Sequence, residues 1–428
     1  CNNTPPVAAR GDGVYVVGAD GRRWLDGCGG AAVSCLGHSP HAAVAAVKAQ
    51  LDVLPWAHTG FFSTEAAETL AEMLAARAPG EISRAYFTSG GSEAVEAALK
   101  LALQYYKERG ETKRANIISR RQSYHGATLG ALAVGGHLRR REWFAPMFSD
   151  AANHISPCHY FRHGKDGETA EEYARRAAGE LEEKITALGK DTVAAFIAET
   201  VVGATLGAAA AEEGYFKRVR EICDRHGVLL ILDEVMCGMG RTGELFACAR
   251  EKIAPDIICL AKGLGAGVLP VGAMLCREEI YQAVKNGSGA FRHGQTYSAH
   301  PAACAAARAA LGEIETLLPN ARATGENLRA RLRDAFGAHP HVADIRGRGM
   351  FIGMEFAREG KTPFPAEKKI YAAVQKAAFG EGLMIYGGGG CADGVCGDHI
   401  LIAPPFIFTE AHAEELVEKL SRALQNVF

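Results

Sequence analysis

The chain has 428 residues, of which 48% are hydrophobic and 22% are charged, a balance typical of a folded globular protein rather than a disordered or fibrous one. Its 47 Lys and Arg residues are offset by 49 Asp and Glu residues, so the net charge is -2 and no basic excess exists for binding nucleic acid or an anionic membrane. Because a single hydrophobic core rarely grows beyond about 250–300 residues, the length predicts one large domain and a smaller one.

Along most of the chain, short β-branched runs alternate with amphipathic helical stretches, which is the pattern of a parallel α/β sheet. The expected helices of this region are 64–78, 92–109 and 215–226. The expected strands are 84–88, 116–119, 193–198, 228–232 and 256–260. The last two strands are almost continuously apolar, which indicates that both of their faces are buried.

From about Pro301 the pattern is helical as far as Phe336, and the remainder resembles a smaller α+β unit. This unit has expected strand segments at 341–356 and 399–403 and expected helices at 366–379 and 409–424. We therefore expect an N-terminal segment that packs with the small domain, a large domain and a C-terminal small domain, over residues 1–54, 55–309 and 310–428.

Two charged residues directly follow the apolar strands, at the sheet edge where open parallel sheets bind ligands. Asp233 follows strand 228–232, where a carboxylate is costly unless it meets a cation or hydrogen-bond donors. Lys262 follows strand 256–260, between two leucines, and weak hydration there favours the neutral, nucleophilic amine. A helix-capping Asp and a surface Lys are the alternatives. One α/β crossover separates the two residues, so both can face the same crevice.

A third strand end carries a glycine-rich turn. Strand 84–88 leads into Ser89-Gly90-Gly91-Ser92 and then a helix, whose free N–H groups and dipole favour an anion, most naturally a phosphate. The turn is neither a Walker loop nor a dinucleotide fingerprint. The alternative is an ordinary turn, which uses the same residues. The glycines of 263–267 do not form a dinucleotide loop, because no helix is expected after them and Pro270 follows.

An anion cradle, an activated lysine and an acidic partner match a cofactor with a phosphate, an aldehyde and a basic nitrogen. Pyridoxal 5'-phosphate (PLP) has these groups, and its chemistry needs a lysine for the Schiff base and an acid that keeps the pyridine nitrogen protonated. No metal is expected. The clusters in 156–164 and 389–399 lack the Cys-x2-Cys spacing of a structural zinc site, and the twelve cysteines, most of them single, suit a reducing cytoplasm.

At these residues the chain resembles the class III PLP-dependent aminotransferases of fold type I, in the branch of ω-amino acid and amine:pyruvate transaminases. The resemblance covers essentially the whole chain and depends most on LLILDEVMCGMGRTGELFA (229–247) and PDIICLAKGLGAG (255–267). Further blocks follow the family in order: TSGGSEAVEAALKLA (88–102), SYHGATLGAL (123–132), AETVVGATLG (198–207), HGQTYSAHPAACAAA (293–307) and DIRGRGMFIGMEF (344–356). It implies a large PLP-binding domain with a mostly parallel central sheet and a smaller α+β domain.

The resemblance also implies catalytic roles. Lys262 forms the Schiff base with PLP and then shuttles the substrate proton, and Asp233 pairs with the pyridinium nitrogen. Glu199 lies near the hydroxyl side of the cofactor. Tyr124 stacks on the cofactor ring, and Val235 packs on its other face.

The remaining implied contacts concern the phosphate and a second subunit. Gly90, Gly91 and Ser92 hold the phosphate, and His125 of the same YHG block as Tyr124 belongs to the cofactor-binding set. Thr296 reaches the phosphate of the neighbouring subunit, so the smallest active unit is a homodimer, alone or within a tetramer.

We therefore expect a cytoplasmic enzyme that moves an amino group from an ω-amino acid or amine to a keto acid, with pyruvate ahead of 2-oxoglutarate, by a ping-pong mechanism. One departure concerns the substrate: the arginine that many relatives place before the Pro-Pro turn falls at Gly394 here. Arg292 and the arginines of 139–141 are candidates for its role. Decarboxylases, racemases, aminomutases and phospho-lyases share the same cofactor site and remain alternatives, whereas a purely binding protein is opposed by the intact site residues.

Overall fold

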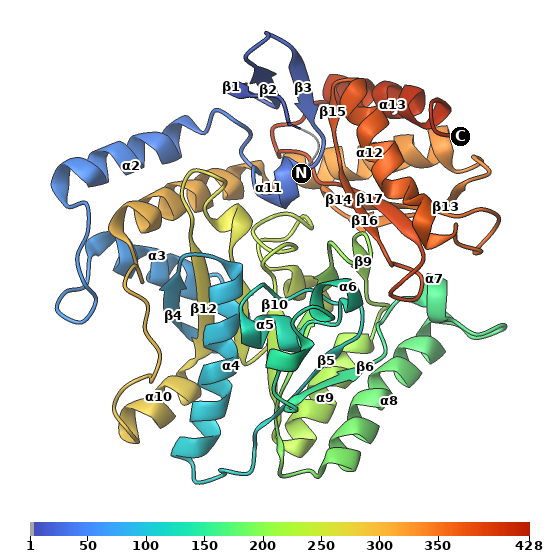
Figure 1. Cartoon of the computed structure of the whole chain (residues 1–428). Coiled ribbons are helices and arrows are strands. Elements are labelled where there is room, and N and C mark those ends of the chain that lie inside the picture. The colour runs from blue at the N-terminus through green and yellow to red at the C-terminus, as the bar shows by residue number, and fades with distance from the viewer. Residues whose placement is uncertain (1–3) are drawn as a thin grey trace.

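A seven-stranded sheet forms the centre of the molecule in the computed structural model, which describes residues 4–428 (Figure 1). Its strands, in spatial order, are β4 (Ile82–Thr88), β12 (Gly272–Arg277), β11 (Ile257–Leu260), β10 (Leu229–Asp233), β7 (Val193–Glu199), β5 (Asn116–Arg120) and β6 (Ala152–Ile155). Strands β11, β10, β7, β5 and β6 are parallel, and β12 runs antiparallel to both β11 and β4. The predicted mostly parallel α/β sheet is therefore confirmed.

Helices cover both faces of this sheet because side chains alternate along each strand. Leu229 and Ile231 of β10 join the apolar cluster of α4 (Gly91–Glu108), whereas Leu230 and Leu232 join the cluster that contains α8 (Ala170–Leu188) and α9 (Tyr215–His226). Two-sided burial explains why the sequence of β10 is continuously apolar. Three further helices of this region are α3 (Glu65–Ala75), α5 (Leu129–Val134) and α10 (Glu278–Asn286).

A second sheet, entirely antiparallel, forms the C-terminal part of the chain (Figure 1). Its strands, in spatial order, are β13 (Val342–Arg348), β14 (Phe351–Phe356), β17 (Asp398–Ile402) and β16 (Tyr386–Gly389). The segment 341–356 folds into a hairpin, whose turn uses Gly349 at a φ of 53°. Helix α12 (Ile370–Gly380) packs on β16 and β17 and also on α13 (Glu410–Gln425). The predicted smaller α+β domain is confirmed.

The N-terminal segment contacts the C-terminal part through a small sheet. Strands β1 (Ala8–Asp12), β2 (Tyr15–Gly18) and β3 (Arg23–Asp26) form a meander, and β3 pairs in parallel with β15 (Leu383–Met384). Residues 1–3, at the start of the expected segment 1–54, lie outside the described residues.

The long helix α11 (Pro301–Phe336) connects the large and small parts and crosses the proposed boundary between residues 309 and 310 without a break. It packs against α3, α13 and α2 (His41–Val53). The short elements are α1 (Gly29–Ala32), α6 (Leu138–Arg141), α7 (Tyr160–His163), β8 (Val201–Val202) and β9 (Ala209–Ala210). In the described part of the chain, none of the helices has the length and apolarity needed to cross a membrane.

Candidate active site

Three predicted site residues lie at or just after the carboxyl ends of adjacent central strands. Asp233 is the last residue of β10 and lies directly opposite Glu199, the last residue of β7. Lys262 begins the short 3-10 turn η3 (Lys262–Leu264) that follows β11. All three line a cavity of about 390 Å³. The strand-end reasoning therefore located the cavity, because parallel strands that end at one sheet edge bring their following residues together.

The predicted site residues lie in this cavity with one exception. Those that line it are Gly90, Gly91, Ser92, Tyr124, His125, Glu199, Asp233, Val235 and Lys262. Thr296 lies outside the cavity, on the exposed loop before α11. The cavity also receives Val33 from the N-terminal segment, which no motif in the sequence singled out.

The amine of Lys262 is held in a partly buried position by a constrained backbone. Its φ of 46° lies in the left-handed region, which is uncommon for a residue with a side chain. Burial lowers the pKa of Lys262, while the negative charges of Asp233 and Glu199 act in the opposite direction. The net shift is downward, so a larger fraction of the amine is neutral, and the neutral amine is the nucleophilic form.

Asp233 is buried and forms two well-defined hydrogen bonds. Its Oδ2 lies 2.8 Å from Nδ1 of the buried His125, and its Oδ1 accepts from the backbone N–H of Val235 at 3.0 Å. The imidazole therefore orients the carboxylate from one side, and the backbone fixes it from the other. The two hydrogen bonds compensate for much of the cost of burying an acid at the end of an apolar strand.

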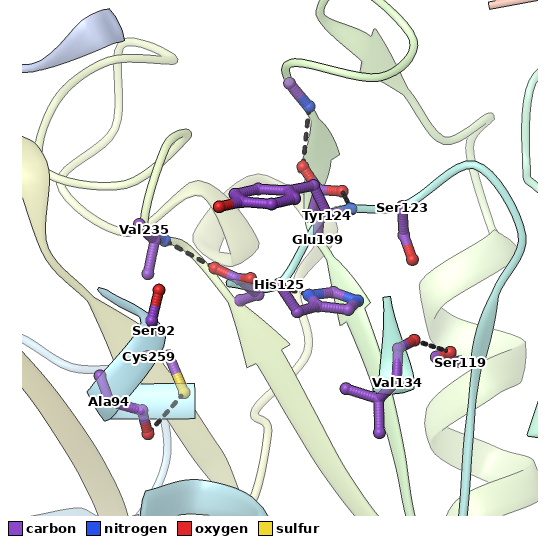
Figure 2. A network of polar contacts seen from close by, with 12 residues as sticks. Ser92, Ala94, Ser119, Ser123, Tyr124, His125, Val134, Glu199, Val235 and Cys259 are labelled. Carbon is purple, nitrogen blue, oxygen red and sulfur yellow. Dashed lines mark hydrogen bonds and ion pairs between the residues drawn. The ribbon is translucent and has the colours of Figure 1, made fainter. Parts of the chain in front are cut away.

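Glu199 is also buried, and backbone groups fix both of its oxygens. Oε1 accepts from the N–H of Tyr124 at 3.0 Å, and Oε2 accepts from the N–H of Gly203 at 2.9 Å. Burial raises the pKa of Glu199, and the neighbouring Asp233 adds to the increase. Figure 2 shows Glu199 and His125 beside the ring of Tyr124. The carboxyl group thus couples the end of β7 to the loop that carries Tyr124.

The start of α4 lies where the anion cradle is predicted, and close contacts leave no room for a side chain at Gly91 or at Gly126 of the neighbouring loop. A Cβ on Gly91 would lie 2.6 Å from Cγ1 of Val235, and a Cβ on Gly126 would lie 2.8 Å from Cα of Ser92. Oγ of Ser92 accepts from the N–H of Ala127 at 3.0 Å, which leaves its own proton available. The helix N-terminus and this hydroxyl together offer several donors to a bound phosphate.

Two buried charges that the sequence reasoning did not single out support the site. Glu234 accepts from Oγ1 of Thr200 at 2.9 Å and from the N–H groups of Ala247 and Cys248 at 2.6 and 2.7 Å. Arg120 donates to the backbone oxygen of Glu199. A charged residue beside Asp233 was the available signal for Glu234, but its partners lie far along the chain.

Among residues 4–428, no group of three or more His, Cys, Asp and Glu side chains is arranged to hold a metal ion. The charged groups of the cavity are instead a lysine, two carboxylates and an N-terminal helix cradle. This donor set suits an organic cofactor with a phosphate at one end.

Comparisons with known proteins place the chain in a family. Residues 2–424 match the family model of class-III aminotransferases. An uncharacterized aminotransferase of Schizosaccharomyces pombe is 43% identical over 99% of this chain and 93% of the relative.

The chain belongs to the class III aminotransferases. Its motif resemblance to that family is thereby confirmed, as is the assignment as an enzyme. Two solved structures extend the similarity to three dimensions. An (S)-enantioselective omega-transaminase from Thermomicrobium roseum has a TM-score of 0.93 at 34% identity, covering 100% of this chain and 93% of the other. A PMP-bound aminotransferase from Vibrio fluvialis has a TM-score of 0.92 at 31% identity, covering 99% and 93%.

The aminotransferase therefore has the fold of the fold type I PLP-dependent transferases, and its cofactor is PLP. The residues of the cavity fit this group. The open backbone at Gly91 and the hydroxyl of Ser92 suit the phosphate, the buried carboxylate of Asp233 suits a protonated ring nitrogen, and the amine of Lys262 suits the aldehyde.

Proposed function

We propose that this aminotransferase moves an amino group from an ω-amino acid or an amine to a keto acid, with pyruvate preferred to 2-oxoglutarate, in a ping-pong sequence through Lys262. The observation that carries the proposal is the placement of Lys262, Asp233 and Glu199 on adjacent strand ends around one cavity. Its similarity to an omega-transaminase of Thermomicrobium roseum over the whole chain supports an amino group remote from a carboxylate.

Lys262 has two roles in this proposal. Its amine would hold PLP at the aldehyde carbon, with release of water, and the lowered pKa of Lys262 favours the neutral amine that such attachment requires. When it is not attached to the cofactor, the Lys262 amine would take a proton from the substrate carbon and return it on the cofactor side. General acid–base catalysis of this kind contributes about 10²–10⁴-fold.

Bound PLP supplies a protonated aromatic ring that accepts the electron pair released at the substrate carbon. Asp233 holds the proton on the ring nitrogen, and His125 keeps the carboxylate oriented. Tyr124 and Val235 form the two walls of the ring site, and the start of α4 binds the phosphate. The hydrogen bond from the backbone N–H of Tyr124 to Glu199 holds Tyr124 in place as one of these walls.

Steady-state kinetics test the reaction type. Purified protein with PLP is assayed with β-alanine, taurine, a diamine or an α-amino acid against pyruvate or 2-oxoglutarate. Parallel double-reciprocal lines and stoichiometric formation of the new amino acid are expected with the ω-donors. Release of carbon dioxide, or inversion of a stereocentre without a keto acid, would instead establish one of the other reactions of this fold.

The proposal includes a homodimer, alone or within a tetramer, with Thr296 donating to the phosphate of the neighbouring active site. Apolar side chains that are well exposed in the single chain support a subunit interface: Val53 is 82%, Phe61 81% and Trp143 80% exposed. Light scattering of the holoenzyme should give at least twice the chain mass, and Thr296→Ala should weaken PLP binding. A monomer with full activity would contradict this part.

A cytoplasmic location is also proposed. The described cysteines are all unpaired thiols, and most are buried. Unpaired thiols of this kind suit a reducing compartment. Fractionation of the native cells, followed by activity measurement, is the direct test.

A further inference from the structure

Three consecutive arginines on α6 (Leu138–Arg141) lie near the cavity, and their side chains have different surroundings. Arg139 donates from Nη2 to the backbone oxygen of Val395 at 2.9 Å. The guanidinium of Arg141 lies over the ring of Phe148, 5.2 Å from its centroid. That of Arg140 lies over the ring of Tyr124, 4.6 Å from its centroid. Only the middle arginine is therefore directed at a residue that lines the cofactor cavity.

The loop that carries an arginine in many relatives cannot do so here without rearrangement. Gly394 has a φ of 93°, a conformation that side-chain-bearing residues rarely adopt. A Cβ at this position would lie 3.0 Å from Cδ1 of Leu138. Leu138 and the anchored Arg139 thus fill the space beside the loop. Helix α6 therefore packs Leu138 close to this loop and places the guanidinium of Arg140 over the ring of Tyr124.

The positive charge of Arg140 is not matched within the part of the chain that the structure describes. Arg140 is exposed, and among residues 4–428 no carboxylate pairs with it and no side-chain hydrogen bond holds it. It is close enough to Lys262 for its charge to contribute, after burial, to the lowering of the pKa of that amine. Neither Arg140 nor the other candidate, Arg292, lines the cavity itself. Arg140 stacks on the lining residue Tyr124, whereas Arg292 is an exposed loop residue whose backbone N–H donates to Oε1 of Gln104 on α4.

We propose that Arg140 binds the carboxylate of the substrate, in place of an arginine at position 394. The inference rests on the proposed transamination, since it names the residue that recognises the acid. A guanidinium on an aromatic face is weakly held at an exposed site and can turn to a carboxylate, which binds it through two parallel charge-assisted hydrogen bonds. A donor without a carboxylate leaves Arg140 on Tyr124.

The test compares substrates with and without a carboxylate in the holoenzyme. In Arg140→Gln, the KM of pyruvate or of β-alanine should rise by about 10- to 100-fold, the loss expected for hydrogen bonds to a charged group. For benzylamine, which has no carboxylate, KM should change less than about twofold. Arg140→Lys keeps the positive charge but cannot form two parallel hydrogen bonds to a carboxylate. Its KM values for the two acids should lie between those of wild type and Arg140→Gln.

Arg139→Gln is the matched control, because it removes the same charge from the same helix at a side chain that contacts the backbone of Val395 and not a ring that lines the cavity. It should leave the KM values of both acids and of the amine close to wild type. A rise in the KM of pyruvate alone in Arg140→Gln assigns Arg140 to the α-carboxylate of the acceptor. A rise in the KM of β-alanine alone assigns it to the carboxylate of the donor. Unchanged KM values for both acids, an equal rise for the amine, or the same pattern in Arg139→Gln would overturn the proposal.

A binding measurement separates this inference from the reaction type. Calorimetric titration of the holoenzyme with propionate, a carboxylate with no reactive carbonyl or amine, should show affinity reduced by about 10- to 100-fold in Arg140→Gln. If wild type binds propionate through Arg140 but transfers no amino group, the proposed function fails and the assignment of Arg140 stands. Equal propionate affinity in both proteins refutes the assignment.

Discussion

Gly91→Ala gives a direct test of how the cofactor cradle is built. The new Cβ would lie 2.6 Å from Cγ1 and 2.9 Å from Cγ2 of Val235, and 3.4 Å from Cβ of Ala261. Carbon atoms in favourable contact are about 3.5–4.0 Å apart, so either the start of α4 or Val235 must move by about 1 Å. Overpacking of this size costs about 1–3 kcal/mol. Because the proposed function assigns the phosphate cradle and one wall of the ring site to these atoms, PLP affinity should fall by about 5- to 150-fold.

The assay is titration of apoenzyme with PLP, followed by the absorbance of the bound cofactor, with thermal unfolding of the apoenzyme in parallel. Gly179→Ala is the matched control, because it makes the same change inside α8, where nothing apart from the adjoining helix backbone lies within 4 Å of the new Cβ. It should bind PLP normally and be more stable by about 0.5–1 kcal/mol. Adding Val235→Ala to Gly91→Ala removes the colliding methyl groups. The double variant should therefore bind PLP about as tightly as Val235→Ala alone. Wild-type PLP affinity in Gly91→Ala would refute the reasoning.

Two further predictions follow from the buried charges. Burial lowers the pKa of Lys262, and the neutral amine is the form that reacts with PLP. The rate at which apoenzyme combines with PLP should therefore rise with pH and reach half its maximum below the pKa of an ordinary lysine. A midpoint at the ordinary lysine pKa would contradict this prediction. Glu234→Gln places a donor against one of the N–H groups of Ala247 and Cys248, which should cost about 1–3 kcal/mol and lower Tm by about 1–3 °C for a chain of this length. The measurement is calorimetry, and the control is Glu244→Gln, which removes a half-exposed carboxylate paired with Arg322. An unchanged Tm in Glu234→Gln would show that these hydrogen bonds contribute little.

The position of the candidate site could be predicted from the sequence because its signals are local. Asp233 and Lys262 each follow a continuously apolar run, and a buried parallel strand is recognisable from that run alone. Since all such strands end at one edge of the sheet, two residues placed by local patterns were also placed relative to each other. The glycine-rich turn before α4 added the third side of the cavity in the same way.

The parts that the sequence did not yield depend on contacts between distant segments. Strand β12 runs antiparallel to its neighbours, and the direction of a strand cannot be read from its composition. Glu234 is satisfied by backbone groups of Ala247 and Cys248, and Arg120 by the backbone of Glu199. Consecutive arginines look alike in a sequence, and only the packing of α6 against the loop at Gly394 separates Arg140 from Arg139.

The central claim is that this chain transfers amino groups through Lys262, and a single-turnover half-reaction tests it most directly. Holoenzyme is mixed with one ω-amino acid or amine and no keto acid, and the cofactor spectrum and the carbonyl product are measured together. The proposed mechanism predicts one carbonyl product per active site with full conversion of the cofactor to its pyridoxamine form, and neither in Lys262→Ala. Carbonyl product without that conversion, or conversion in Lys262→Ala at the wild-type rate, would contradict it.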